Sequence, residues 1–309
     1  MEYVLRTNAL TKKYRDFKAL NGLTMNVPKG AIYGFIGKNG AGKTTLIRLI
    51  CGLQSATSGD YTLYGRKNTD KEISKSRRRM GAVVETPSIY LDMTAEDNLK
   101  QQYRILGLPS YDGMKDILKL VGLEDTGKKK ARNFSLGMRQ RLGIAVALTG
   151  SPDFLVLDEP VNGLDPQGII EIRELILKLN REQQITFLIS SHILDELSKI
   201  ATHYGFIDKG QMVKEISAED LENACRKCVR LEVTNIGALA HVLDGMEVEY
   251  NVISDRKADV YAKVNVSKLT LALAKVNCEV ISMQERDESL ESYYVSLLTS
   301  GNSGAARRD

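Results

Sequence analysis

The most specific chemical signal in the sequence is a glycine-rich loop that ends in a lysine and a threonine. The pattern G-x-x-x-x-G-K-[ST] runs from Gly37 through Gly42 to Lys43 and Thr44. Glycines let backbone N–H groups close around an anion, a lysine can reach phosphate oxygens, and a threonine hydroxyl can bind Mg²⁺. The pattern predicts a nucleotide phosphate site, to which we assign Gly37, Asn39, Gly40, Gly42, Lys43, Thr44 and Thr45.

Two further strand ends carry side chains that complete this chemistry. The apolar stretch FLVLDEP places Asp158 at the end of a buried strand, where its carboxylate can hold Mg²⁺ beside Thr44. Glu159 faces differently and can polarise an attacking water. The apolar strand ITFLIS delivers His192 to the same edge of the sheet, where a neutral imidazole can contact the γ-phosphate and orient the water. We therefore assign catalytic roles to Lys43, Glu159 and His192.

In their order along the chain, these motifs resemble the ATP-binding subunit of ABC transporters over residues 3 to about 220. The match consists of the glycine-rich loop, Glu85 after a strand, NFSLGMRQRLGIAVAL, LVLDEP, NGLDP and SSH, all with family-like spacing. The resemblance implies two subunits that sandwich two ATP molecules, closing when ATP binds and opening after hydrolysis. The implied cofactors are ATP and Mg²⁺, with Thr44, Glu85 and Asp158 as the residues at the metal.

The resemblance also implies roles for residues outside the loop. Tyr14 matches the aromatic residue that stacks on adenine in the family. Ser135 and Gly137, in SLGMRQR at the start of a helix, match the signature that binds the γ-phosphate held by the other subunit. Asp165 matches the acidic residue of the loop that couples the two sites.

Two departures from the family pattern indicate a subgroup. The usual signature is LSGGQ, and here Leu136 and Met138 replace a glycine and the glutamine. Glu85 stands where the family has a glutamine, which puts a carboxylate near the metal and the contact with the membrane subunit. Together with the appended C-terminal domain, these departures resemble the bacitracin and lantibiotic self-protection exporters of Gram-positive bacteria. This resemblance implies ATP hydrolysis that powers export of a peptide antibiotic by a separate membrane permease.

An α/β core must position these residues. Short apolar strands alternate with helical patterns, which predicts a largely parallel sheet made of AIYGFIG, RMGAVVE, DFLVLDEP, ITFLISS and HYGFIDKG. The segments YVLRTNAL, GLTMNV, DYTLYG and QMVKEI are predicted to form a flanking antiparallel sheet. Residues from about 88 to 148 are expected to form a helical subdomain, in which TAEDNLKQQYRILGL begins at a capping box of Thr94 and Asp97.

A second, smaller domain is expected after the ATPase domain of residues 1–220. Segments between residues 221 and 298 follow the order β-α-β-β-α-β, which is the ferredoxin-like order of a small α+β domain. Its role as a regulatory element, a brace for the dimer or inert packing stays open. Residues 299–309 are small and polar, and we expect them to be a disordered tail.

Composition and charge limit the partners. The 43 basic and 39 acidic residues nearly balance, so the net charge of +4 gives no reason to expect nucleic acid or an acidic membrane surface. The runs Arg77 to Arg79 and Lys128 to Lys130 are expected to be solvated. No segment has the length needed to cross a bilayer, and the N-terminus lacks a signal-peptide pattern. We therefore expect a cytoplasmic subunit, held at the inner face of the cell membrane by its permease.

Other functional classes also use a glycine-rich phosphate loop. A soluble ABC ATPase acting on ribosomes or nucleic acid is the alternative, but such proteins carry two cassettes or a long coiled coil. A P-loop kinase would need neither the SLGMRQR segment nor His192, and hydrolysis of ATP without an acceptor separates it from an ATPase. Since the chain contains both loop and signature, two identical copies can build a symmetric pair. The permease sets the transported substrate, so this chain does not define it.

Overall fold

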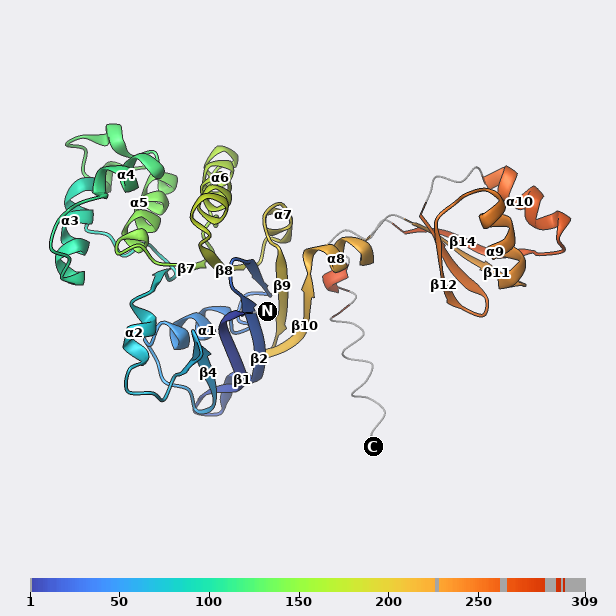
Figure 1. Ribbon diagram of the computed structural model, residues 1–309, viewed down its shortest axis with the longest axis horizontal. Coiled ribbons are helices and arrows are strands. Elements are labelled where there is room, and N and C mark those ends of the chain that lie inside the picture. Colours follow the sequence, from blue (N-terminus) through green and yellow to red (C-terminus); the bar gives the residue numbers. More distant parts are fainter. Residues whose placement is uncertain (1, 226–227, 262–265, 287–292, 296, 298–309) are drawn as a thin grey trace. The chain divides into compact units, whose positions relative to one another are not determined.

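The chain divides into two units, Met1–Ala218 and Glu219–Ser296, each described here by itself. The computed structural model (Figure 1) describes residues 2–225, 228–261, 266–286, 293–295 and 297. The expected tail, 299–309, lies outside the described residues. None of the described helices combines the length and apolar character needed to span a membrane.

A six-stranded sheet forms the centre of the first unit. Its strands are β3 (Ile32–Ile36), β6 (Met80–Val83), β7 (Phe154–Asp158), β8 (Thr186–Ser191), β9 (His203–Asp208) and β10 (Gln211–Ser217), in the order β10-β9-β3-β8-β7-β6. All pairs except β9 with β10 are parallel. Every residue of β3, β7 and β8 is buried, which explains why these strands are almost continuously apolar. The predicted parallel α/β core is confirmed.

An antiparallel sheet flanks this core. It contains β1 (Tyr3–Tyr14), β2 (Phe17–Pro28), β4 (Ser58–Leu63) and β5 (Arg66–Lys67), in the order β2-β1-β4-β5. Between the two sheets lies α1 (Lys43–Ile50), whose Leu46 and Ile47 are buried in one core cluster with Leu5 of β1 and Leu188 of β8. The helix that follows the glycine-rich loop is thus enclosed by apolar side chains from both sheets.

The position of β10 corrects one prediction. QMVKEI was expected in the flanking sheet, but β10 pairs antiparallel with β9 and forms the edge of the central sheet. The physical reason is a two-residue turn, Lys209 and Gly210, in which both residues have positive φ, of 45° and 77°. Such turns join neighbouring strands into a hairpin. β10 still contacts the flanking sheet, because Glu215 accepts a hydrogen bond of 2.9 Å from the backbone N–H of Asn26.

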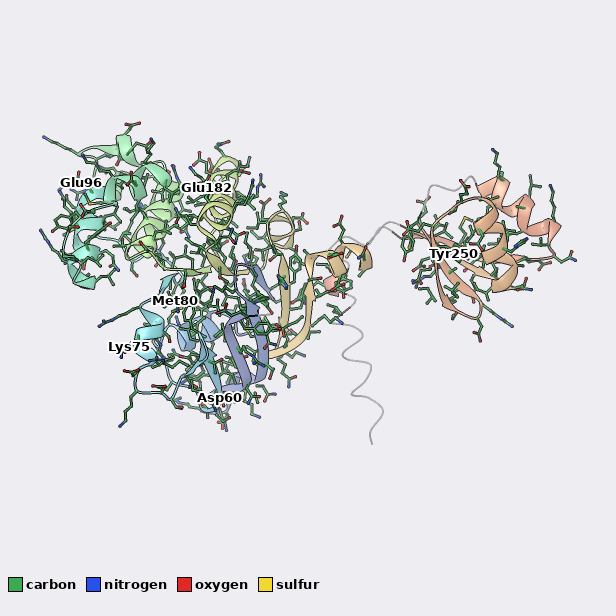
Figure 2. The ribbon with its side chains drawn as sticks, in the orientation of Figure 1. Asp60, Lys75, Met80, Glu96, Glu182 and Tyr250 are labelled. Atoms are coloured by element: carbon green, nitrogen blue, oxygen red, sulfur yellow. The ribbon has the colours of Figure 1, made fainter. Side chains whose placement is uncertain are left out.

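The helical subdomain consists of α3 (Ala95–Leu106), α4 (Met114–Leu120) and α5 (Leu136–Leu148), which pack on one another (Figure 1). α3 begins at the predicted capping box, in which Thr94 and Asp97 exchange hydrogen bonds between side chain and backbone. Figure 2 labels Glu96 on α3 and Asp60 on β4, which mark this subdomain and the flanking sheet. The remaining helices of the unit are α2 (Ile73–Arg77), α6 (Pro166–Gln183) and α7 (Leu194–Ser198), with 3₁₀ turns at Glu124–Thr126 and Ala131–Asn133.

The basic run Arg77 to Arg79 is not a uniformly solvated face. Arg77 donates a 2.6 Å hydrogen bond to the hydroxyl of Tyr61. Arg79 lies over the ring of Tyr64, 3.8 Å from its centroid, and pairs with Asp153. A planar guanidinium can stack on a ring and bind a carboxylate at once, so these side chains join segments of the fold. The side chains of Arg78 and Arg79 are nevertheless exposed, as expected for these two residues.

The second unit has the predicted β-α-β-β-α-β order. After α8 (Ala218–Ala224), which begins at the boundary between the units, the elements in this order are β11 (Cys228–Val233), α9 (Ile236–Gly245), β12 (Tyr250–Ser254), β13 (Lys257–Val260), α10 (Val266–Lys275) and β14 (Val280–Arg286). The strands form one antiparallel sheet in the order β12-β13-β11-β14, with Tyr250 labelled on β12 in Figure 2. Leu231, Leu239 and Leu273 belong to its own apolar core. The α+β architecture is therefore confirmed.

Candidate nucleotide-binding and catalytic site

The glycine-rich loop connects β3 to α1 by a backbone path that only glycine allows. Gly42 caps α1 with a φ of 113°, and a Cβ atom there would lie 2.5 Å from the carbonyl oxygen of Ala19. A Cβ on Gly37 would lie 2.6 Å from the backbone of Ile207. Lys43, whose side chain is only 6% exposed, turns back and donates a 2.6 Å hydrogen bond to the carbonyl of Gly37. The loop therefore curls around its own ammonium group, as a phosphate cradle requires.

Asp158 ends β7 beside the loop, with one carboxylate oxygen free to bind a ligand. The register of the sheet places Asp158 opposite Ser190 of β8, whose hydroxyl donates to Asp158 Oδ1. Asp158 is 1% exposed, and its Oδ2 has no hydrogen-bond partner among the described residues. A buried oxygen of this kind requires an explanation, and a cation supplies one. The carboxyl ends of β3, β7 and β8 thus meet at one edge, where parallel sheets bind ligands.

Glu159 bridges the loop and the histidine. Its Oε1 lies 3.2 Å from Lys43 Nζ, and its Oε2 lies 2.8 Å from His192 Nδ1. The backbone of Glu159 has a φ of 50°, uncommon for a residue other than glycine, and its N–H donates to the carbonyl of Ser190 at 3.1 Å. Glu159 is therefore in direct contact with both of the other residues that have assigned catalytic roles.

An open pocket of about 380 Å³ lies over the loop. Its lining residues are Tyr14, Phe17, Ala19, Asn39, Gly40, Gly42, Lys43, Thr44, Thr45, Arg48, Gln54 and Glu159. The hydroxyl of Tyr14 donates to Gln54, and Lys12 Nζ lies 5.1 Å from the centre of the Tyr14 ring. The pocket therefore combines aromatic surface at one part with loop backbone and Lys43 at another, as a nucleoside triphosphate requires.

Sequence reasoning missed several lining residues. Phe17 lies directly opposite Tyr14 in the β1–β2 hairpin, and this pairing could have been predicted from the short polar turn between two strand patterns. Arg48 could have been found by helical spacing, since it lies one turn after Thr44 on α1. Gln54 follows a glycine-containing turn, and no pattern in the sequence indicates its direction.

Glu85 lies in a second left-handed backbone position, two residues after the end of β6. It has a φ of 60°, and its side chain, 55% exposed, pairs with Arg48. Two residues further on, Pro87 packs against α5, where a Cβ on Gly143 would lie 2.6 Å from the Pro87 side chain. The loop therefore contacts α1 through Glu85 and α5 through Pro87. The role of Glu85 at the metal stays a prediction.

The signature residues lie on a different part of the first unit from the loop. Ser135 caps α5, its hydroxyl accepting a 3.2 Å hydrogen bond from the N–H of Met138. Gly137 lies next to α6, because a Cβ atom built on Gly137 would be 3.9 Å from the Cα of Gly168. Asp165 caps α6 by accepting a 3.0 Å hydrogen bond from the N–H of Gly168. Signature and coupling loop are thus neighbours, and neither lines the pocket over the chain's own loop.

The fold and these contacts define a P-loop ATPase. A family model described as "ABC transporter" matches residues 20–162. The bacitracin transport ATP-binding protein BcrA of Bacillus licheniformis is 38% identical over 98% of this chain and 100% of its own. The lantibiotic transport ATP-binding protein SrtF of Streptococcus pyogenes is 42% identical over 71% of this chain and 93% of its own. The structure of cbiO1 from Clostridium perfringens, part of the ABC transporter complex cbiONQ, is 25% identical with a TM-score of 0.65, over 72% of this chain and 92% of that one. The chain belongs to the ATP-binding subunits of ABC transporters, and it is an ATPase.

Proposed function

We propose that Glu159 is the base that polarises the attacking water, and that His192 holds its carboxylate in place. The observation that carries this proposal is the contact of 2.8 Å between Glu159 Oε2 and His192 Nδ1, at the end of a buried strand beside the loop. The imidazole orients the carboxylate and can place a donor or acceptor toward the γ-phosphate. Lys43 then exchanges Glu159 for phosphate oxygens, and this exchange frees Oε1 for the water.

We further propose that Thr44 and Asp158 hold Mg²⁺. The unpartnered, buried Asp158 Oδ2 fits a cation. Among the described residues no cluster of three or more His, Cys, Asp or Glu side chains could hold a metal, which suits an ion that takes most ligands from phosphates and water. When bound, Mg²⁺ neutralises charge that develops on the phosphate oxygens. Glu85 can contact the metal only if its ion pair with Arg48 breaks, so its role at the metal needs a separate test.

The adenine is assigned to the aromatic wall of the pocket. Tyr14 presents its ring while its hydroxyl is fixed by Gln54, so the ring face can stack without rotating. A second copy of the chain supplies Ser135 and Gly137 to the same ATP. Because these residues lie outside the chain's own pocket, each site of the pair combines one loop with the partner's signature.

The energy of hydrolysis is passed to a separate membrane permease, at the inner face of the cell membrane. Exposed apolar side chains suitable for this contact, Tyr90 and Leu91, follow the Glu85 loop closely. Because the relatives matched over most of the chain transport bacitracin or a lantibiotic, we propose a peptide antibiotic as the exported substrate. In this assignment residues 1–220 are the ATPase domain, with the helical subdomain at about 88–148, and residues 221–298 are an accessory domain.

The test is co-purification from membranes of tagged Glu159→Gln protein, with size analysis after addition of ATP and Mg²⁺. We expect a multi-span permease and an ATP-dependent dimer, because binding contacts remain while the water loses its base. Glu182→Gln is the matched control, since Glu182 is exposed at the end of α6 (Figure 2). Recovery of ribosomes or nucleic acid without membrane protein would overturn the exporter proposal. Hydrolysis at the unaltered rate would exclude Glu159 as the base.

A further inference from the structure

An ion pair joins the two helices that follow the catalytic strand ends. Arg173 lies in α6, and its Nη1 donates a 3.3 Å hydrogen bond to Oε2 of Glu196 in α7. Both side chains are only 20% exposed. The pair is therefore shielded from water more than most ion pairs of the first unit, and its geometry matters more than theirs.

The chain connects this pair directly to Glu159 and His192. From Glu159 the backbone runs through a short loop into α6, and from His192 it enters α7 within two residues. The two catalytic side chains meet at 2.8 Å, and the two helices behind them meet at Arg173 and Glu196. A shift of α7 relative to α6 would therefore move the imidazole relative to the carboxylate.

Both apolar packing and polar contacts hold α7 in place. The helix has only five residues, too few to be stable without tertiary contacts. It is anchored by buried Leu194 and Leu197, and a small cavity of about 20 Å³ lies between it and α6. The cavity wall contains Pro160 and Ser191, which are neighbours of the catalytic residues, and both members of the ion pair. The ion pair therefore borders this gap in the packing, and it adds a directional contact between the two helices.

We propose that Arg173 and Glu196 are positioning residues that hold His192 against Glu159. This inference rests on the proposed catalytic roles of those two residues. Glu196 also binds Lys199, with Oε1 and Nζ 2.6 Å apart, so loss of Arg173 leaves its charge partnered. Removing Arg173 therefore changes the position of α7 more than it creates an unpaired charge.

The experiment measures kcat and KM for ATP in the full-length chain with Arg173→Met, Glu196→Gln and both together. We expect Arg173→Met to lower kcat about tenfold, with KM changed less than about twofold, because misplacement affects the reacting geometry rather than binding. Glu196→Gln keeps a hydrogen-bond acceptor for Arg173, so its kcat should fall less than that of Arg173→Met. The double variant should be no worse than Arg173→Met, because both act through one contact.

The controls separate positioning from folding and from the proposed function. Arg66→Met breaks a more exposed ion pair, Arg66 with Glu72, which lies far from the catalytic residues in the sequence, and it should leave kcat unchanged. The midpoint of thermal unfolding identifies a variant that does not fold. If Arg173→Met does not fold, the kcat of Glu196→Gln tests the positioning role. If Glu159→Gln is inactive while Arg173→Met and Glu196→Gln keep the original kcat, the positioning role is wrong and the base assignment stands. If Glu159→Gln is active, the base assignment itself fails. A higher KM with an unchanged kcat would also overturn the positioning role.

Discussion

Lys43 Nζ lies 3.2 Å from Glu159 Oε1, so the cation of the glycine-rich loop is paired with the carboxylate assigned as the base. In the proposed mechanism Lys43 binds phosphate and Glu159 acts on water, and the contact between them blocks both roles, because the ammonium cannot bind the carboxylate and a phosphate at the same position. Binding of the triphosphate must therefore compete for Lys43 before Glu159 can act on water. Affinity and catalysis are linked through one contact.

Lys43→Ala should weaken ATP binding about 10- to 100-fold, because it removes a charged hydrogen-bond donor to phosphate. Calorimetric titration of the full-length protein with ATP in the presence of Mg²⁺ measures this. Lys38→Ala is the matched control: Lys38 belongs to the same loop, has an exposed side chain, and contributes only its backbone carbonyl to Lys43. Equal affinities of the two variants would contradict the role of Lys43.

Asp158→Asn should raise the Mg²⁺ concentration needed for hydrolysis by about tenfold or more, since an amide is a poorer ligand than a carboxylate. ATP binding without Mg²⁺ should change little. The measurement is the ATPase rate as a function of Mg²⁺ concentration. Asp153→Asn, next to the opposite end of β7, serves as control and should keep the original dependence. An unaltered Mg²⁺ dependence in Asp158→Asn would remove Asp158 from the metal site.

Gly143→Ala should destabilise the protein by about 1–3 kcal/mol, although alanine favours helices by about 1 kcal/mol over glycine. The added Cβ would lie 2.6 Å from the Pro87 side chain, so the Glu85 loop or α5 must move. Gly237→Ala in α9 is the matched control, because the nearest atom to its Cβ is 3.5 Å away, and it should be neutral or stabilising. Chemical denaturation of each variant measures the free energy of unfolding. Equal changes in the free energy of unfolding for both variants would show that Pro87 can move away from the added methyl group without destabilising the protein.

Cys51 should make stability depend on pH above about 9. Burial raises the pKa of its thiol from 9.0 to about 12; Arg77 lowers it and Asp158 raises it by smaller amounts. The folded protein thus disfavours the thiolate, so this contribution to stability is complete below pH 9 and is lost as pH rises toward 12. Relative to Cys51→Ser, the original protein should lose about 1.4 kcal/mol per pH unit in that window. Denaturation curves at pH 8 and 10.5 test this, and a constant difference would contradict it.

Sequence patterns predicted the elements of the fold well where local signals and burial agree. The strands β3, β7 and β8 are apolar because both of their faces are covered. The capping box of Thr94 and Asp97 correctly predicted the start of α3. β10 was misplaced because an alternating strand pattern does not specify which sheet it joins. The turn at Lys209 determines that β10 pairs with β9. The positive φ of Lys209 could not be predicted, because lysine rarely adopts that conformation.

The site was predictable in its residues but not in their contacts. Spacing brought Lys43, Asp158 and Glu159 to one edge of the sheet. The pairing of Glu85 with Arg48, and of Arg173 with Glu196, joins residues far apart in sequence, and no periodicity encodes it. Arg79 is exposed as predicted, but its pairing with Asp153 was not predictable for the same reason, since Asp153 is 74 residues away.

Glu85 and Glu159 both hold the left-handed backbone conformation, with φ of 60° and 50°. A side chain other than glycine in that conformation costs roughly 1–2 kcal/mol. Glycine at either place would relax the backbone, and selection for stability alone would favour it. Under the roles proposed for these two carboxylates, a redesign that places glycine at either position would gain stability and lose activity.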